Sequence, residues 1–130
     1  MEKILFQTQL DLSIQFQTEE VRLAYIDEIT VQFRRQMETL LGHHLVKMEN
    51  KEKLVRYFRL FANISTRFYG PVRVKYDFEC NRVIYGVKTD YLCISIETAS
   101  EWREIIGSQD LEISAENDEF WVEVTLIGLL

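Results

Sequence analysis

The first pattern along the chain is an alternation of apolar and polar side chains near its start. Across residues 4–16 the even positions are apolar apart from one threonine, and the odd positions from 7 to 17 are amide, hydroxyl or carboxylate residues. A period of two is typical of a strand that buries one face. The pattern therefore predicts a strand over residues 4–16, about twice the usual strand length of ~5–6 residues. Its polar face carries a single charge, Asp11, so little on that face discourages pairing with another strand.

Two segments with helical spacing come next. Thr18 has the hydroxyl of a good N-cap and is followed by two glutamates, which suit the positive end of a helix dipole. With apolar residues every three or four positions after it, the sequence predicts a helix over about 19–41 that ends at Gly42. A second helix is predicted over about 50–66, with Asn50 as its N-cap.

The second half of the chain changes to short alternating segments after a break at Gly70-Pro71. Valine, tyrosine and phenylalanine alternate with charged residues over 72–79, which is a strong strand pattern. The remaining predicted elements are strands at 83–87 and 91–97, a short helix at about 99–106, and a hairpin of 111–113 with 120–127.

This order of elements predicts an α+β fold. We expect a single domain, 1–130, in which a largely antiparallel sheet of about five to six strands packs against two or three helices. If the second helix is an insertion, the order resembles the ferredoxin-like βαββαβ plan. A sheet curled around one long helix is the alternative that the pattern leaves open.

Composition and length fit this fold and indicate the cellular compartment of the protein. The chain has 130 residues, of which 47% are hydrophobic, enough for a core without disulfide or metal staples. The start of the sequence lacks the apolar run of a signal peptide, and no stretch approaches the ~20 apolar residues of a membrane span. We therefore expect a cytoplasmic protein in which Cys80 and Cys93 stay reduced.

Charge is divided unevenly along the chain. Residues 1–46 carry a net charge of −3, residues 47–92 carry +5 and residues 93–130 carry −8, within a total of −6. A basic middle and an acidic end predict either two poles that face partners or two poles that face each other inside the fold. The net acidity disfavours general nucleic-acid binding, although the basic segment keeps that function open.

Few residues form a pattern that suggests catalysis. His43 and His44 are adjacent, and adjacent side chains seldom reach the same metal ion, for which three or four ligands are needed. Cys80 has Arg82 two residues away, which is a weak hint of a stabilised thiolate. We expect no metal and no cofactor, and we favour a non-enzymatic protein over an enzyme.

What remains is a set of predicted interaction surfaces. Arginine with interleaved aromatic residues, as found in the basic segment, is the composition of protein interfaces and of nucleic-acid surfaces alike. We predict a small cytoplasmic protein-binding domain with an adaptor, accessory or inhibitor/immunity-type role, whose partner is another protein, a second copy of the chain, or both. The predicted partner-binding residues are Arg56, Arg59, Arg67, Arg73, Lys75, Glu112, Glu116, Asp118 and Glu119.

Two alternative functions stay open at this point. One is nucleic-acid or nucleotide binding through the basic segment 47–88, where phosphate contact would use the arginines and lysines. The other is a small-molecule-binding or enzymatic domain that uses His43, His44 or Cys80 in a pocket between sheet and helices. We expect no membrane partner.

Overall fold

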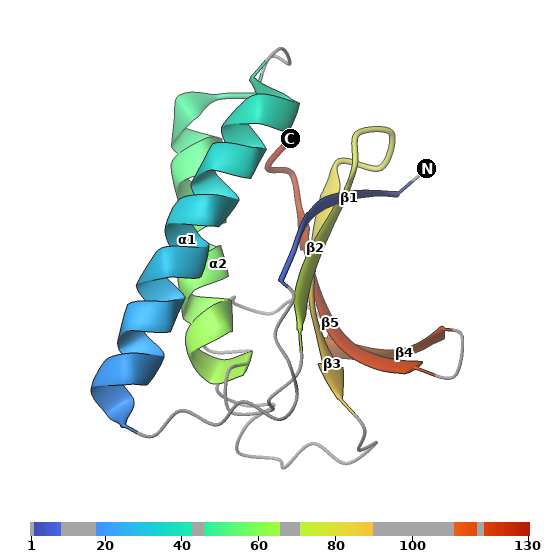
Figure 1. The fold of residues 1–130 in the computed structure, drawn as a ribbon. Helices are drawn as coiled ribbons and strands as arrows, with labels where there is room; N and C mark the ends of the chain where they lie inside the picture. The colour runs from blue at the N-terminus through green and yellow to red at the C-terminus, as the bar shows by residue number, and fades with distance from the viewer. Residues whose placement is uncertain (1, 9–17, 43–45, 66–70, 90–110, 117–118) are drawn as a thin grey trace.

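In the part of the chain that the structure describes, two helices lie side by side on one face of a five-stranded antiparallel sheet (Figure 1). The structure is a computed structural model that describes residues 2–8, 18–42, 46–65, 71–89, 111–116 and 119–130, of which 89, 111–116, 119 and 120 are described by their backbone. The elements are β1 (Lys3–Gln7), α1 (Glu19–Leu41), α2 (Met48–Ser65), β2 (Val72–Asp77), β3 (Arg82–Thr89), β4 (Leu111–Glu116) and β5 (Glu119–Ile127). The sheet has the order β1-β2-β3-β5-β4, and every neighbouring pair is antiparallel.

This arrangement confirms the α+β class, with an antiparallel sheet and two helices in the described residues. The ferredoxin-like plan is wrong for these strands, because it needs neighbouring parallel strands and β1 instead pairs antiparallel with β2. The cause is the helix pair between them: α1 and α2 run in opposite directions, so the chain returns to the end of the sheet at which it left β1 (Figure 1). The predicted strand at 91–97 and helix at 99–106 lie outside the described residues.

The first strand departs from the simple alternation that its sequence predicts. Its register with β2 shifts between Ile4 and Phe6, so Leu5 is an extra residue in the ladder. Such a bulge turns the residues after it to the other face. Leu5 and Phe6 are therefore both buried in the core, whereas Ile4 is 55% exposed on the opposite face. The structure ends β1 at Gln7, and residues 9–17 of the predicted strand lie outside the described part of the chain.

The helix starts agree with the predicted capping residues in one case and not in the other. Thr18 caps α1, because its hydroxyl accepts a hydrogen bond of 3.2 Å from a backbone N–H of the first turn. The prediction for α2 is wrong by two residues, since this helix begins at Met48 and Asn50 lies inside its first turn. The backbone N–H of Lys51 already donates to the carbonyl oxygen of Lys47 at 3.0 Å, which sets the earlier start.

Polar side chains hold α1 and α2 together as an antiparallel pair. At one end, Arg22 donates to the backbone and side-chain oxygens of Asn63, at 2.8 and 2.9 Å. Asn63 belongs to the last turn of α2, where carbonyl oxygens have no partner within the helix. Further along the pair, the ion pairs are Asp27 with Arg59, Arg34 with Glu52 at 2.6 Å, and Glu38 with Lys51 at 3.6 Å. The residue numbers rise along one helix as they fall along the other, as an antiparallel pair requires.

The core lies between the helices and the sheet and is built around aromatic rings. Phe33 and Phe58 are stacked with ring centres 4.3 Å apart, and Phe6 of β1 meets both rings edge-on. Tyr85 of β3 adds a polar link, because its hydroxyl donates to the carbonyl oxygen of Leu54 in α2 at 2.7 Å. Burial raises the pKa of Tyr85 well above its ordinary value, so the phenol stays protonated in this contact.

Candidate functional site on the outer face of the sheet

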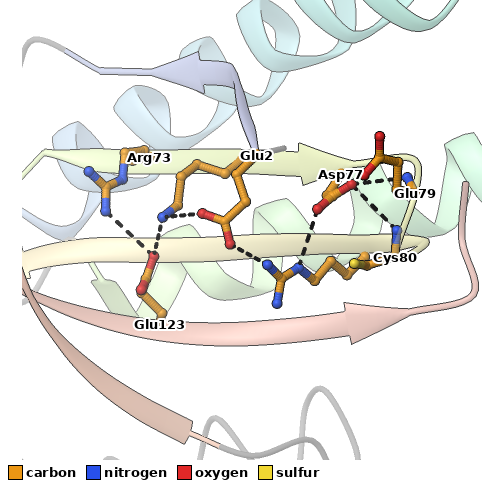
Figure 2. A network of polar contacts seen from close by, with 8 residues as sticks. Glu2, Arg73, Asp77, Glu79, Cys80 and Glu123 are labelled. Carbon is orange, nitrogen blue, oxygen red and sulfur yellow. Dashed lines mark hydrogen bonds and ion pairs between the residues drawn. The ribbon is translucent and has the colours of Figure 1, made fainter.

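The sheet face that points away from α1 and α2, which we call the outer face, carries three of the four charged side chains that are buried in the described residues. The sequence of β2 explains this placement. Its valines and tyrosine face the helices, so the alternate residues Arg73, Lys75 and Asp77 face outward. Figure 2 shows Arg73 and Asp77 together with Glu2 and Glu123.

The outer-face charges form a continuous chain of ion pairs. The Oε2 atom of Glu123 lies 3.5 Å from Nη2 of Arg73 and 3.3 Å from Nζ of Lys75. Lys75 is also 3.1 Å from Glu2, and Glu2 in turn accepts a hydrogen bond of 2.6 Å from Arg82. Because opposite signs alternate along this chain, each charge that the fold removes from water is compensated by its neighbours.

Gly86 makes room for Arg73 and Glu123, which form one end of this series of ion pairs. It lies between Arg73 and Glu123 in the cross-strand register, and a Cβ atom there would be 3.3 Å from Cγ of Glu123 and 3.5 Å from the Trp121 ring. The guanidinium of Arg73 lies 3.8 Å from the centre of that ring, which is a close cation–π contact. Trp121 is 2% exposed, and its Nε1 donates to no described residue. The stack orients Arg73 toward Glu123.

The series of ion pairs ends at Asp77, which is the last residue of β2 and organises the turn between β2 and β3. Its Oδ1 accepts hydrogen bonds from the backbone N–H of Glu79 at 2.9 Å and of Cys80 at 3.4 Å (Figure 2). Burial acts to raise the pKa of Asp77. The hydrogen bond from Cys80, the positive charge of the N-terminus and the hydrogen bond from Glu79 together outweigh burial, and the pKa lies below its ordinary value of 3.8. Asp77 is therefore ionised at neutral pH, with its Oδ2 4.0 Å from Nε of Arg82.

Three observations in the described residues bear on the predicted catalytic or metal site. A cavity of about 160 Å³ lies beside the turn, whereas ligand pockets usually hold about 300–1,000 Å³. Cys80 is exposed and does not line that cavity, and His43 and His44 lie outside the described residues. Within the same residues, no group of three or more histidine, cysteine or carboxylate side chains is placed to hold a metal ion. The cavity is lined by Lys3, Tyr76, Asp77, Phe78 and Glu79.

Two of the predicted basic residues, Arg73 and Lys75, belong to the outer-face ion pairs. Their shared partner, Glu123, comes from the acidic end of the sequence. This contact answers one question that the charge distribution leaves open, because a basic and an acidic segment meet inside the fold.

The other predicted basic residues lie on α2 or beyond it. Arg59 pairs with Asp27 of α1, and Arg56 lies over the ring of Tyr57, with its guanidinium 5.2 Å from the ring centre. Arg67 lies outside the described residues. The members of the predicted basic set that the structure describes are thus divided between the helix layer and the outer face of the sheet.

The predicted acidic residues that the structure describes all lie on the β4–β5 hairpin. In the Cα register, Glu112 lies opposite Glu123, and Glu116 lies opposite Glu119. Directly opposite positions of an antiparallel pair share a face, so glutamates face each other at two places, four residues apart on β4. At the first of these places, Glu123 is already paired with Arg73 and Lys75. Asp118 lies outside the described residues.

Sequence reasoning missed Glu2, Gly86 and Trp121 as members of the outer face. Glu2 has no sequence pattern around it, and its two partners are more than seventy residues away. Trp121 could have been placed by the alternation of β5, because it shares the parity of Glu123 and is opposite in parity to the core residues Val122 and Val124.

No family model and no curated protein matches this sequence. Neither helix in the described part of the chain is long and apolar enough to cross a membrane. A functional conclusion must therefore come from the charges and contacts of the fold itself.

Proposed function

We propose that this chain is a protein-binding domain that docks a basic segment of another protein on the β4–β5 hairpin. The observation that carries the proposal is the register of the hairpin, which sets Glu116 opposite Glu119 and places Glu112 on the same face of β4. Like charges directly opposite each other destabilise a pair of strands. A fold that keeps Glu116 opposite Glu119 gives up stability where a cationic partner would restore it, and departures of this kind are expected at functional sites.

The distribution of cations supports the hairpin over the basic segment as the docking surface. Arg73 and Lys75 are held by Glu123, and Arg59 is held by Asp27. In the register of the described strands, by contrast, no basic residue stands opposite the three remaining glutamates of the hairpin. These glutamates are Glu112, Glu116 and Glu119.

The nucleic-acid alternative has less support, because phosphate binding needs cations that are free to meet the backbone. Three of the candidate cations already bind carboxylates of the chain. The cytoplasmic location and the adaptor, accessory or inhibitor/immunity-type role remain part of the proposal.

The test begins with a photo-crosslinking amino acid at Ser114, between the two glutamates of β4, to capture the protein that meets the hairpin in its host. The captured protein is then purified, and its Kd is measured for the wild type and for Glu112→Gln/Glu116→Gln. A matched control, Glu20→Gln/Glu49→Gln, makes the same change of net charge on exposed residues of the two helices. We expect the hairpin variant to bind about tenfold more weakly or worse, and the control to bind like the wild type.

Stability gives the second readout of this test. Because the hairpin variant removes charge repulsion, it should unfold at the same or a higher urea concentration than the wild type. A partner that binds the hairpin variant and the wild type equally well contradicts the proposal. So does a hairpin variant that is less stable, since the glutamates would then be serving the fold.

A further inference from the structure

The side of α1 that faces away from the sheet carries an unexpected set of residues. Val21, Ala24, Glu28, Val31 and Arg35 recur every three or four positions, so they form one stripe along the helix, which we call the outward stripe. All five are exposed, Val21 by 52% and Val31 by 49%. The buried residues of the same helix lie on the opposite side; they are Ile26, Ile29, Phe33, Met37 and Leu41.

The neighbouring helix α2 shows which residue types occupy a water-facing surface of the helix layer. Apart from Met48 at its first position, the exposed residues of α2 are all charged: Glu49, Glu52, Arg56 and Arg59. Three of the five residues in the outward stripe of α1 are apolar instead. Two of them are valines, which favour helix formation less than lysine, glutamate or glutamine do. Neither solvation nor helix propensity favours valine at these positions.

The two charges of the outward stripe also differ from most charges on α1. Those that face α2 or the helix start are paired: Glu19 with Arg22, Asp27 with Arg59, Arg34 with Glu52, and Glu38 with Lys51. Glu28 accepts a long hydrogen bond of 3.5 Å from Gln32. Among the described residues, neither Glu28 nor Arg35 forms an ion pair.

We infer that the outward stripe binds the same stripe of a second copy of this chain, with the two α1 helices antiparallel. At 1.5 Å per residue, Glu28 lies about 4.5 Å before Val31 along the axis and Arg35 lies about 6 Å after it. A two-fold axis near Val31 therefore sets Glu28 of each copy opposite Arg35 of the other, so opposite charges meet twice. A parallel arrangement would set each charge against its own kind, which opposes it.

The small side chains of the stripe suit this contact, but its size limits the affinity. The two-fold axis brings Val31 of the two copies together and sets Ala24 and Val21 of each copy opposite Thr39 and Gly42 of the other, which are also exposed. These small residues allow two helices to approach closely, and the contact buries apolar surface that the single chain leaves in water. One helix-on-helix contact covers less than the ~800 Å² per partner of a standard interface. We therefore expect a weak dimer, with a Kd on the order of tens to hundreds of micromolar. This inference uses a different surface from the hairpin and does not depend on it.

Sedimentation equilibrium from about 10 µM to about 1 mM tests the inference on four proteins. They are the wild type, Glu28→Arg, Arg35→Glu, and the double variant Glu28→Arg/Arg35→Glu. Each single variant turns two attractive pairs into two repulsive ones, so we expect its dimer to be at least about tenfold weaker. The double variant exchanges the charges and should return the Kd to near the wild-type value.

A matched control is Glu49→Arg, which reverses an exposed charge on α2 in the same way as Glu28→Arg and should leave the association unchanged. Thermal melting followed by circular dichroism establishes that every variant is folded. A wild type that stays monomeric over the whole concentration range overturns the inference. A dimer that ignores the single reversals, or that the double variant fails to restore, overturns it as well.

Discussion

The two faces of the sheet bury side chains of opposite character on the same strands. The face toward the helices holds Tyr85 against the stacked rings of Phe33 and Phe58, and Val74 belongs to the same core. The outer face holds ion pairs, a buried arginine and a buried tryptophan. Apolar side chains stabilise in proportion to the area that they remove from water, whatever their exact neighbours are. A buried charge depends on one particular partner, and it becomes a liability when that partner is lost.

Burial therefore has two different consequences in this fold. On the helix side, burial measures how much stability a residue contributes. On the outer face, burial measures how strongly a residue depends on another one. Glu123 shows this dependence, because both Arg73 and Lys75 rely on it.

The largest effect is expected on the helix side. Phe58 is fully buried in the ring stack, so Phe58→Ala should lower the free energy of unfolding by about 3–5 kcal/mol. The matched control is Phe78→Ala, since Phe78 is 37% exposed and should lose about 1 kcal/mol or less. Urea denaturation of the two variants measures both values. Equal losses at the two positions would show that the ring stack is not the centre of the core.

The next effect is expected at the centre of the outer face. Glu123→Gln keeps the shape of the side chain but leaves Arg73 and Lys75 without their shared carboxylate. We expect a loss of about 2–3 kcal/mol, below the full cost of breaking a buried pair because Lys75 keeps its contact with Glu2. Urea denaturation at neutral pH measures the loss.

A second variant tests whether the ion pairs of Glu123 make the fold more stable, or whether the charged side chains only need one another once they are buried. Arg73→Met/Lys75→Met/Glu123→Leu removes all three charges and should unfold within about 1–2 kcal/mol of the wild type. If this triple variant were far less stable than Glu123→Gln, the ion pairs themselves would be a main source of stability. Buried side chains on the two faces of the sheet would then contribute to stability in much the same way.

The helices and most strands could be predicted because their signals are local. A capping hydroxyl such as Thr18, an apolar repeat of three and four, and strict alternation in β2 act within a few residues. The strand order depends instead on how many helices join β1 to β2, and on their directions. The sequence contains both helices, but it does not say that they pair with each other and return the chain.

The candidate site was predicted in part, for a similar reason. Basic and acidic segments could be recognised from the sequence, and Arg73, Lys75 and Glu123 were among their members. Their pairing could not be predicted, because it depends on the register of β2, β3 and β5. The bulge at Leu5 is a further case: one extra residue turned Ile4 away from Phe6, against a perfect alternation.

A smaller effect, visible as a change with pH, is expected at the end of the outer face. The pKa of Asp77 is below its ordinary value of 3.8 in the folded chain. Its charge therefore contributes stability above about pH 4, and this contribution is lost as the pH falls through the folded pKa. Asp77→Asn keeps an oxygen that can accept the turn hydrogen bonds but removes the charge. The unfolding free energies of the two proteins should differ at pH 6 and converge toward pH 2, and parallel pH profiles would contradict the assignment.

The smallest effect is expected for the ion pair between Asp27 and Arg59, which joins the two helices at their surface. Both side chains are about half exposed, at 59% and 49%, so water and salt screen their attraction. Asp27→Asn should lower the free energy of unfolding by less than about 1 kcal/mol. Urea denaturation at low salt and at about 1 M salt should show that this loss shrinks, while the loss in Glu123→Gln persists.

The Asp27–Arg59 pair can be compared directly with the Arg73–Glu123 pair, because the two have the same chemistry and differ in burial. Each contact joins a carboxylate to a guanidinium, but the exposed fractions are 9% and 11% for Arg73 and Glu123. If Asp27→Asn costs as much as Glu123→Gln, and is equally insensitive to salt, then burial does not decide what an ion pair is worth in this chain. If the two differ as expected, the same chemistry acts as a firm constraint on the outer face of the sheet and as a minor contact on the helix surface.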